Sequence, residues 1–325
     1  MGSPEFALLE LLSPLLDGDG PGVPLGVGDD AAVVDVAGTP VAVAVDTLVA
    51  AVHFDLTRSS WEDVGYKALA VNISDLAAIG AQCSAAVVSL QRPAALEDDD
   101  VLALYRGLRA AADTWRCRIV GGDTVGGTVA AVSVTAFGAL LGSEPLRRDA
   151  AEVGDVVLVV GELGLAAAGL AAHRAGRADL LEDHPAAGLA HRRPRALPEA
   201  GAALAVAGAN ACIDVSDGLG RDLGHIAAAS QVGVVLDPDR LPLHADVVAV
   251  AEELGIDAVD LVVGGGDDYA LVASVRPHRL ARVETALEAA GLRARVVGEI
   301  VAGDGVRLGD RDVRREGWEH DGGRT

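Results

Sequence analysis

Short apolar runs alternate with amphipathic segments along the whole chain. Residues 41–46 are apolar almost without interruption, which is typical of a strand buried on both faces. Residues 97–114 instead repeat with a helical period and carry acidic residues in the first turn. Because strands and helices alternate in both halves, the pattern predicts an α/β or α+β class for each half.

The remaining elements follow from the same patterns. Further strands are predicted at 85–90, 119–120, 128–140, 156–160, 212–215, 232–236 and 294–300. Further helices are predicted at 163–175, 198–207, 244–254 and 278–290. Residues 177–197 are polar, and no element is predicted there. Between 142 and 154 the composition shifts to Gly, Glu, Pro, Arg and Asp, so the domain boundary is expected in this stretch.

Residues 66–81 predict a helix that is apolar nearly all the way round, ends at Gly80 and is therefore buried. Asn72 and Asp75 are three residues apart and share a face of this helix. An ionised aspartate inside an apolar helix is costly unless a cation or several donors meet it. An ion pair with Lys67 or an arginine would meet this need, and so would a metal ion.

Five turns rich in Gly and Asp recur along the chain, and most of them follow apolar strands. They are Gly28-Asp29-Asp30, Asp46-Thr47, Gly122-Asp123, Asp214-Val215-Ser216-Asp217 and Gly266-Asp267-Asp268. Each one alone is an ordinary turn. If the strands bring them to one sheet edge, however, their carboxylates repel one another by several kcal/mol. Mg²⁺ is the natural partner, because it binds carboxylate oxygens together with substrate phosphates.

The net charge of −22 argues against binding to a nucleic-acid backbone, which requires a basic surface. A nucleotide can still bind through divalent ions. The sequences GxxxxGK[ST], HRD and DFG are absent, so ATP would be held by metals on aspartates and by backbone donors. Lys67 is the only lysine, and arginine supplies the other basic residues.

No apolar run reaches the length of a membrane span without interruption, and no signal-like segment is present, so a soluble cytoplasmic protein with no membrane partner is expected. The three cysteines, Cys83, Cys117 and Cys212, form no CxxC pair and are expected to be reduced. The histidines show no zinc-binding spacing.

Several stretches together resemble the thiamine-monophosphate kinase family, in the superfamily that also holds aminoimidazole ribonucleotide synthetase. They are Gly26–Ala32, Asp46–Phe54 (DTLVAAVHF), Tyr66–Ala81 (YKALAVNISDLAAIGA), Gly121–Thr124, Ile213–Leu219 (IDVSDGL) and Gly264–Leu271. The resemblance spans nearly the whole chain in the expected order. It implies an N-terminal α/β domain, residues 1–149, which binds ATP and Mg²⁺ and pairs its sheet with a twin in a homodimer. It also implies a C-terminal α+β domain, residues 150–325.

The implied activity is ATP-dependent and Mg²⁺-dependent phosphorylation of thiamine monophosphate to thiamine diphosphate, the last step of thiamine diphosphate biosynthesis. The resemblance implies that several Mg²⁺ ions are bound by Asp30, Asp46, Asp75, Asp123, Asp214 and Asp217. It implies ATP contacts at Tyr105, Gly122, Asp123, Arg148 and Ser216, and substrate contacts at His53, Asp267 and Trp318. The acceptor phosphate is mostly deprotonated at neutral pH, so direct in-line transfer with no general base is expected.

Some assignments have alternatives. Asp267 stands where the family usually has Glu, and its shorter side chain weakens the case for direct contact. A one-residue shift in the alignment would place Arg147 instead of Arg148 at ATP. Trp318 either stacks on the substrate or packs the tail against the C-terminal domain, and His53 is either a substrate contact or a surface-loop residue. The alternative functions are another ATP-using activity of the superfamily and a non-catalytic Mg²⁺-nucleotide-binding dimer.

Overall fold

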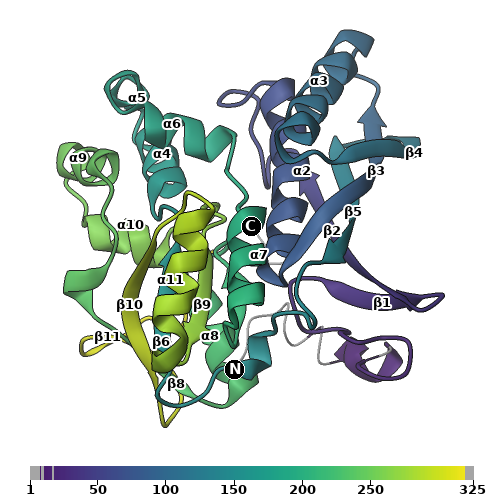
Figure 1. Cartoon of the computed structure of the whole chain (residues 1–325). Helices are drawn as coiled ribbons and strands as arrows, with labels where there is room; N and C mark the ends of the chain where they lie inside the picture. The colour runs from purple at the N-terminus through teal and green to yellow at the C-terminus, as the bar shows by residue number, and fades with distance from the viewer. Residues whose placement is uncertain (1–7, 9–10, 17, 319–325) are drawn as a thin grey trace.

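Two separate sheets organise the chain, and one helix from each half packs between them (Figure 1). The computed structural model describes residue 8, residues 11–16 and residues 18–318. The helices at the boundary are α2 (Trp61–Ala78) and α7 (Pro198–Ala207). A Cβ atom on Gly201 of α7 would lie 2.0 Å from the carbonyl oxygen of Ala77 on α2, so the two helix backbones are in direct contact.

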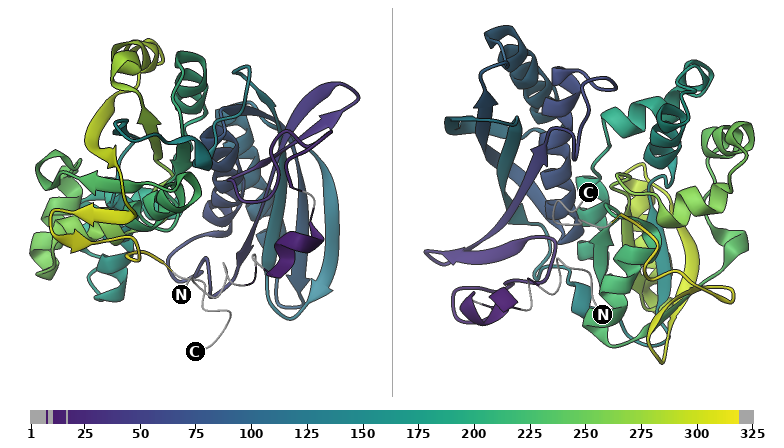
Figure 2. Two further views of the ribbon diagram at one scale, coloured as in Figure 1. Left: turned by 90° about the horizontal axis from the view of Figure 1, so that it is seen from below. Right: turned by 180° about the vertical axis from the view of Figure 1, so that it is seen from behind.

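The N-terminal sheet has the strand order β1-β2-β5-β3-β4. Its strands are β1 (Ala32–Val36), β2 (Thr39–Val49), β3 (Ala81–Pro93), β4 (Arg118–Gly127) and β5 (Ala131–Leu140). Neighbouring strands are antiparallel except β3 and β4, which are parallel. Helices α2 and α3 (Asp98–Trp115) pack on one face (Figures 1 and 2). They approach closely because Gly65 faces the Leu104 carbonyl and Gly107 faces the Glu62 carbonyl, where a Cβ atom would lie within 1.9 and 1.8 Å.

The C-terminal sheet has the order β12-β11-β8-β10-β6-β9-β7. Its strands are β6 (Val156–Val160), β7 (Cys212–Asp214), β8 (Gly233–Leu236), β9 (Leu271–Val275), β10 (Ala294–Val301), β11 (Gly305–Leu308) and β12 (Arg311–Asp312). Apolar residues of α7 and α11 (Leu280–Ala289) form one core with this sheet. A second core contains residues of α4 (Leu165–Arg174), α8 (Leu219–Ser230), α9 (Ala245–Leu254) and α10 (Ala258–Gly264). The unit is therefore a sheet between two helical layers, as Figure 1 shows.

Some elements differ from the sequence-based predictions. Helix α2 begins at Trp61 rather than Tyr66, because Ser60 and Asp63 form a capping box, and it ends at Ala78. Strand β2 continues through Asp46 to Val49, so Asp46 does not stand at a strand end. The short strand predicted at 119–120 is the longer β4.

The prediction that the polar segment 177–197 contains no helix or strand is wrong. The segment contains α5 (Leu180–Asp183) and α6 (Pro185–Arg192), whose few apolar residues suffice because Leu180 and Ala187 are buried. Helix α10 was also missed. We propose to divide the two units between residues 149 and 150, inside the short 3-10 helix η2 (Arg148–Ala150).

All three cysteines are buried and free, as predicted. Two that are distant in sequence are neighbours in space, since the Sγ atom of Cys83 donates to that of Cys117 at 3.0 Å. Of the helices in the described part of the chain, none combines the length and the apolar character that a membrane crossing requires.

Candidate functional site

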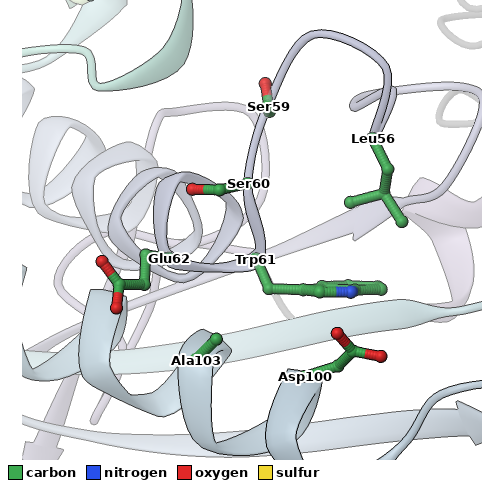
Figure 3. A pocket seen from close by; sticks show the side chains of 7 residues that line it. All are labelled: Leu56, Ser59, Ser60, Trp61, Glu62, Asp100 and Ala103. Atoms are coloured by element: carbon green, nitrogen blue, oxygen red, sulfur yellow. The ribbon is translucent and has the colours of Figure 1, made fainter.

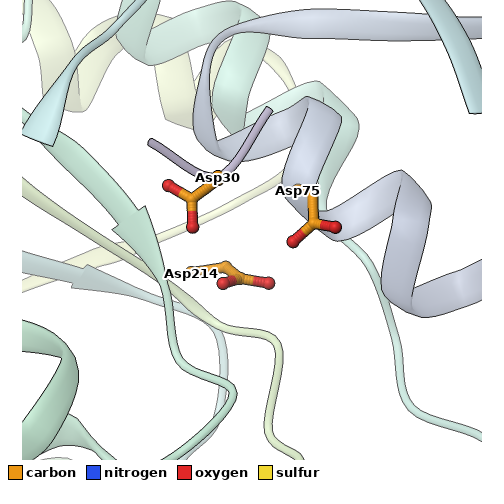
Figure 4. Close-up of side chains that lie close together, drawn as sticks. All are labelled: Asp30, Asp75 and Asp214. Atoms are coloured by element: carbon orange, nitrogen blue, oxygen red, sulfur yellow. The ribbon is translucent and has the colours of Figure 1, made fainter. Parts of the chain in front are cut away.

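Three aspartates converge where the two units meet. Asp30 comes from the turn before β1, Asp75 from α2 and Asp214 from the end of β7, and their carboxylate oxygens lie within 4.8 Å of one another (Figure 4). Burial raises the pKa of Asp75 and Asp214 well above the usual value, and neighbouring carboxylates raise it further. Such a group requires positive charge or protons to be stable.

One arginine supplies part of that charge. The Nη2 atom of Arg148 donates to Oδ1 of Asp30 at 2.6 Å, and its backbone N donates to Asp29 at 2.9 Å. Burial, followed by the charge of Asp30, raises the pKa of Asp29 to about 6. Arg147 turns away and pairs with Asp19 and Asp149, so of the two arginines only Arg148 lies at the carboxylate group.

Two polar residues of α2 orient the acidic segments. The Oγ atom of Ser74 donates to Oδ2 of Asp214 at 2.5 Å, across the boundary between the units. The Oδ1 atom of Asn72 accepts a hydrogen bond from the backbone N of Asp46 at 3.1 Å. Ser74 was not predicted as a site residue from the sequence. The feature that could have identified it is a hydroxyl group next to Asp75 in a helix that is otherwise apolar.

The other predicted metal ligands are placed differently. Asp46 lies beside the cluster of Asp30, Asp75 and Asp214, since its charge contributes to the raised pKa of Asp75 and of Asp214. Asp217 lies 3.5 Å from the Nε atom of Arg221. Asp123 is exposed on β4, and its Oδ1 accepts from the backbone N of Thr124. Among the described residues, only Asp30, Asp75 and Asp214 form a close group.

The turn after Asp214 is built around an aspartate that the sequence analysis missed. Oδ2 of Asp222 accepts from the backbone N atoms of Ser216, Asp217 and Gly218 at 3.0–3.1 Å. The feature that could have identified Asp222 is its place in the first turn of α8, where a carboxylate can accept hydrogen bonds from unpaired backbone N–H groups. The backbone N of Trp318 donates to the carbonyl of Asp217 at 2.8 Å, and the Trp318 residue is 45% exposed. The tail therefore returns to this turn and leaves part of the indole accessible.

Three predicted ATP contacts lie together in one hollow. Tyr105, Gly122 and Asp123 line a space of about 480 Å³ on α3 and β4, together with Ile119, Gly121 and Thr124. A Cβ atom on Gly122 would lie 1.8 Å from the carbonyl oxygen of Val88, so only glycine fits here without a shift of the neighbouring strand. Arg148 and Ser216, the other predicted contacts, do not line this hollow.

A second hollow of about 400 Å³ lies at the N-terminal end of α2 (Figure 3). It is lined by Leu56, Ser59, Ser60, Trp61, Glu62, Asp100 and Ala103. Trp61 precedes Asp75 by almost four helical turns, roughly 21 Å along the axis. The nearby His53 is held to β2, because its Nδ1 accepts from the backbone N of Val49 at 3.0 Å. None of the predicted contacts lines this hollow, and we do not include it in the site.

Asp267 forms an ion pair with Lys67, the only lysine of the chain. The Nζ atom of Lys67 donates to Oδ2 of Asp267 at 2.6 Å, so the ion pair considered between Lys67 and Asp75 is wrong. Lys67 lies two turns before Asp75 on α2 but reaches a loop of the other unit instead. The adjacent Asp268 has a structural contact, because its carboxylate accepts from the backbone N of Gly164 at 2.7 Å, just before α4.

Comparisons with known proteins agree with this architecture. Residues 28–140 match the N-terminal domain of AIR synthase related proteins, and residues 152–311 match the C-terminal domain. The thiamine-monophosphate kinase of Mycobacterium tuberculosis (strain ATCC 25618 / H37Rv) is 43% identical over 250 residues, which are 77% of this chain and 74% of that protein. That of Halobacterium salinarum is 36% identical over 317 residues, covering 97% and 99%.

Among solved structures, AaThiL complexed with AMPPCP and TMP matches with a TM-score of 0.86 and 30% identity, over 97% of this chain and 96% of that one. The two matched domains and the acidic group between them define a member of the AIR synthase-related class. Within this class, the chain belongs to the thiamine-monophosphate kinase family, which confirms the resemblance seen in the motifs.

Proposed function

We propose that this protein transfers the γ-phosphoryl group of ATP to the phosphate of thiamine monophosphate, giving ADP and thiamine diphosphate. The observation that carries the proposal is the convergence of Asp30, Asp75 and Asp214 between the two units. Its relatives are thiamine-monophosphate kinases, and one similar structure is a complex with AMPPCP and TMP.

The donor set at the unit boundary fits Mg²⁺. Three carboxylates face one guanidinium group, so the buried group retains negative charge and offers the hard oxygen ligands that this ion prefers. Asp30, Asp75 and Asp214 would hold the metal, with Asp46 beside them. We propose that Asp123 and Asp217 bind further ions together with the nucleotide. Bound Mg²⁺ would screen the repulsion between the triphosphate and the acceptor phosphate.

The chain's own residues would bind and orient the substrates. Tyr105 is partly buried and offers an aromatic surface to the nucleotide. Gly122, which has no side chain, lets the nucleotide approach the backbone of β4. Arg148 and Ser216 contact the nucleotide from the carboxylate side. His53, Asp267 and Trp318 border the thiamine phosphate.

The acceptor oxygen needs no general base, because the second pKa of a phosphate is about 6. Direct transfer with inversion at a chiral γ-phosphate is therefore expected, and retention would contradict it.

A homodimer is proposed from the exposed part of the N-terminal sheet. Val45 on β2 is 64% exposed and Val120 on the edge strand β4 is 63% exposed. The open edge of β4 is suited to pairing with a strand of a second copy, and the exposed apolar side chain of Val45 is suited to being covered by that copy. Light scattering that gives the mass of a single chain would contradict the dimer. The free thiols of Cys83 and Cys117, 3.0 Å apart, fit a reducing compartment, and we propose the cytoplasm.

The experiment is product identification by chromatography with ATP and Mg²⁺, comparing thiamine monophosphate, thiamine and no acceptor. Thiamine diphosphate formed only from the monophosphate is the expected result. ATP hydrolysis coupled to a different acceptor would favour another activity of the superfamily. Nucleotide binding without any turnover would favour a non-catalytic Mg²⁺-nucleotide-binding dimer.

A further inference from the structure

Helix α2 extends three polar side chains to three separate segments of the C-terminal unit. Asp63 accepts from Nε of Arg193 at 2.5 Å, Lys67 donates to Asp267 at 2.6 Å, and Ser74 donates to Asp214 at 2.5 Å. With 3.6 residues per turn, these three positions fall within about 40° of one another on the helix surface. One face of α2 thus joins the two units through a row of polar contacts.

Lys67 makes the middle contact of this row. Its side chain is only 6% exposed, whereas that of Asp267 is 32% exposed. The other oxygen of Asp267, Oδ1, accepts from the hydroxyl group of Tyr269 at 3.1 Å. The Lys67 ammonium group is therefore buried beneath the Asp267 carboxylate. Both oxygens of that carboxylate accept hydrogen bonds, and its side chain is still partly exposed to solvent.

The loop that carries Asp267 has an unfavourable backbone conformation. Asp267 and Tyr269 adopt φ angles of 67° and 53°, a left-handed region that non-glycine residues rarely enter. The surrounding structure imposes this shape, because the backbone N of Asp267 donates to the Ser216 carbonyl at 2.7 Å and that of Tyr269 donates to the Val215 carbonyl at 2.8 Å. Residues persist in such conformations where their surroundings over-determine them, and functional sites are where this is common.

The electrostatic contact reinforces the same geometry. Burial alone would raise the pKa of Asp267, but the charge and the hydrogen bond of Lys67 outweigh it and hold that pKa below its usual value. Without Lys67, the Asp267 carboxylate would lose its only paired cation among the described residues. It would then rotate toward solvent or take up a proton, and the strained loop would lose one of its supports.

We propose that Lys67 is a positioning residue, which fixes the Asp267 carboxylate and its loop in the orientation that receives thiamine monophosphate. The inference rests on the proposed function, in which Asp267 borders the acceptor. It adds a role for the only lysine of the chain, at an interdomain contact more than a helical turn from the acidic group.

The first test is Lys67→Met, which keeps an unbranched side chain one atom shorter and removes the charge. We expect the KM for thiamine monophosphate to rise about tenfold or more, with the KM for ATP within twofold of the wild type. The matched control is Arg193→Met, which breaks the neighbouring contact on the same face of α2 and should leave the ratio of the two KM values unchanged. Thermal midpoints of both variants are measured alongside.

A merely structural role predicts a lower thermal midpoint in both variants with no split between the KM values, and this result would overturn the proposal. Should Lys67→Met not fold, Lys67→Arg keeps the charge on a different head group. It is expected to fold and to keep the KM for thiamine monophosphate much closer to that of the wild type than to that of Asp267→Ala. A KM for thiamine monophosphate in Lys67→Arg as high as that of Asp267→Ala would overturn the proposal, and so would an Asp267→Ala variant whose KM equals that of the wild type.

The wild-type protein offers a readout that does not depend on turnover. Labelling with [¹³Cε]lysine gives one side-chain signal, since Lys67 is the only lysine. Thiamine monophosphate alone should shift this signal, and AMPPCP alone should shift it much less. An unchanged signal at an acceptor concentration that calorimetry shows to be saturating would overturn the proposal. A shifted signal without formation of thiamine diphosphate would support the positioning role while rejecting the proposed reaction.

Discussion

The carboxylate group at the unit boundary and the hollow beside β4 are built in opposite ways. Asp30, Asp75 and Asp214 come from three distant segments, and Asp214 joins the other two only when the C-terminal unit docks on the N-terminal one. Tyr105 and Asp123 come from α3 and β4, which follow each other in one unit. The first site is assembled by tertiary packing, whereas the second is completed within a single domain.

The two places also differ in how they treat charge. At the boundary, burial and mutual repulsion push the pKa of Asp75 and Asp214 upward, and one guanidinium group offsets only part of the negative charge. At the hollow, Asp123 is exposed and water can screen it. The boundary therefore concentrates buried negative charge, whereas the hollow leaves the Asp123 carboxylate exposed to solvent.

The largest effect is expected from removing one charge at the boundary. Asp75→Asn should lower kcat by roughly 10²–10³-fold, the loss typical of removing one electrostatic group from a catalytic site. The fold should persist, because the neutral amide relieves repulsion with Asp30 and Asp214. Steady-state kinetics and circular dichroism check both points. A variant that loses stability but keeps full activity in its folded fraction would show that Asp75 has only a structural role.

An intermediate effect is expected at the hollow. Tyr105→Ala removes an aromatic wall and should raise the KM for ATP by about tenfold, within the range that one aromatic contact contributes. The KM for thiamine monophosphate should stay within twofold, because the hollow is separate from Asp267. Initial-rate measurements with each substrate varied in turn decide this. Equal increases in both KM values would contradict the separation of the two sites.

The smallest effect is expected in the pH dependence of stability without divalent ions. The pKa of Asp75 and of Asp214 is raised in the folded state, so their favourable contribution is complete below the usual value of 3.8 and is lost as the pH rises through the raised pKa. The thermal midpoint in EDTA should therefore fall by several degrees between about pH 4 and pH 7. Mg²⁺ should restore it at pH 7 and have little effect near pH 4.

Two variants sharpen this measurement. Asp75→Asn should flatten the pH dependence in EDTA, whereas Asp123→Asn, at the exposed hollow, should leave the curve as in the wild type. Equal flattening by both variants would show that the slope arises from general surface charge and not from the buried group.

Residue order alone was enough to predict the elements that depend on local pattern. The apolar run of α2 and the presence of strand β2 could be read from residue order, because periodicity acts over a few neighbours. The prediction that β2 is buried on both faces is wrong, since Val45 is 64% exposed, and the predicted turns at Asp46-Thr47 and Gly122-Asp123 lie inside β2 and β4. The motifs around Asp30, Asp75 and Asp214 also identified the family. The short helices α5, α6 and α10 could not be read, since segments of four, eight and seven residues are too short to show a helical period.

The pairing of charged side chains depends on contacts between segments that are distant in the sequence. Lys67 lies two helical turns from Asp75, yet its partner is Asp267, 200 residues away in the chain. Arg148 rather than Arg147 faces Asp30 because the chain packs within the N-terminal unit, and Ser74 reaches Asp214 because the two units dock. Sequence patterns report which residues are polar and which face they share. The partner of a buried charge depends on long-range packing, because the free-energy cost of leaving a buried charge unpaired exceeds the conformational preferences of neighbouring residues.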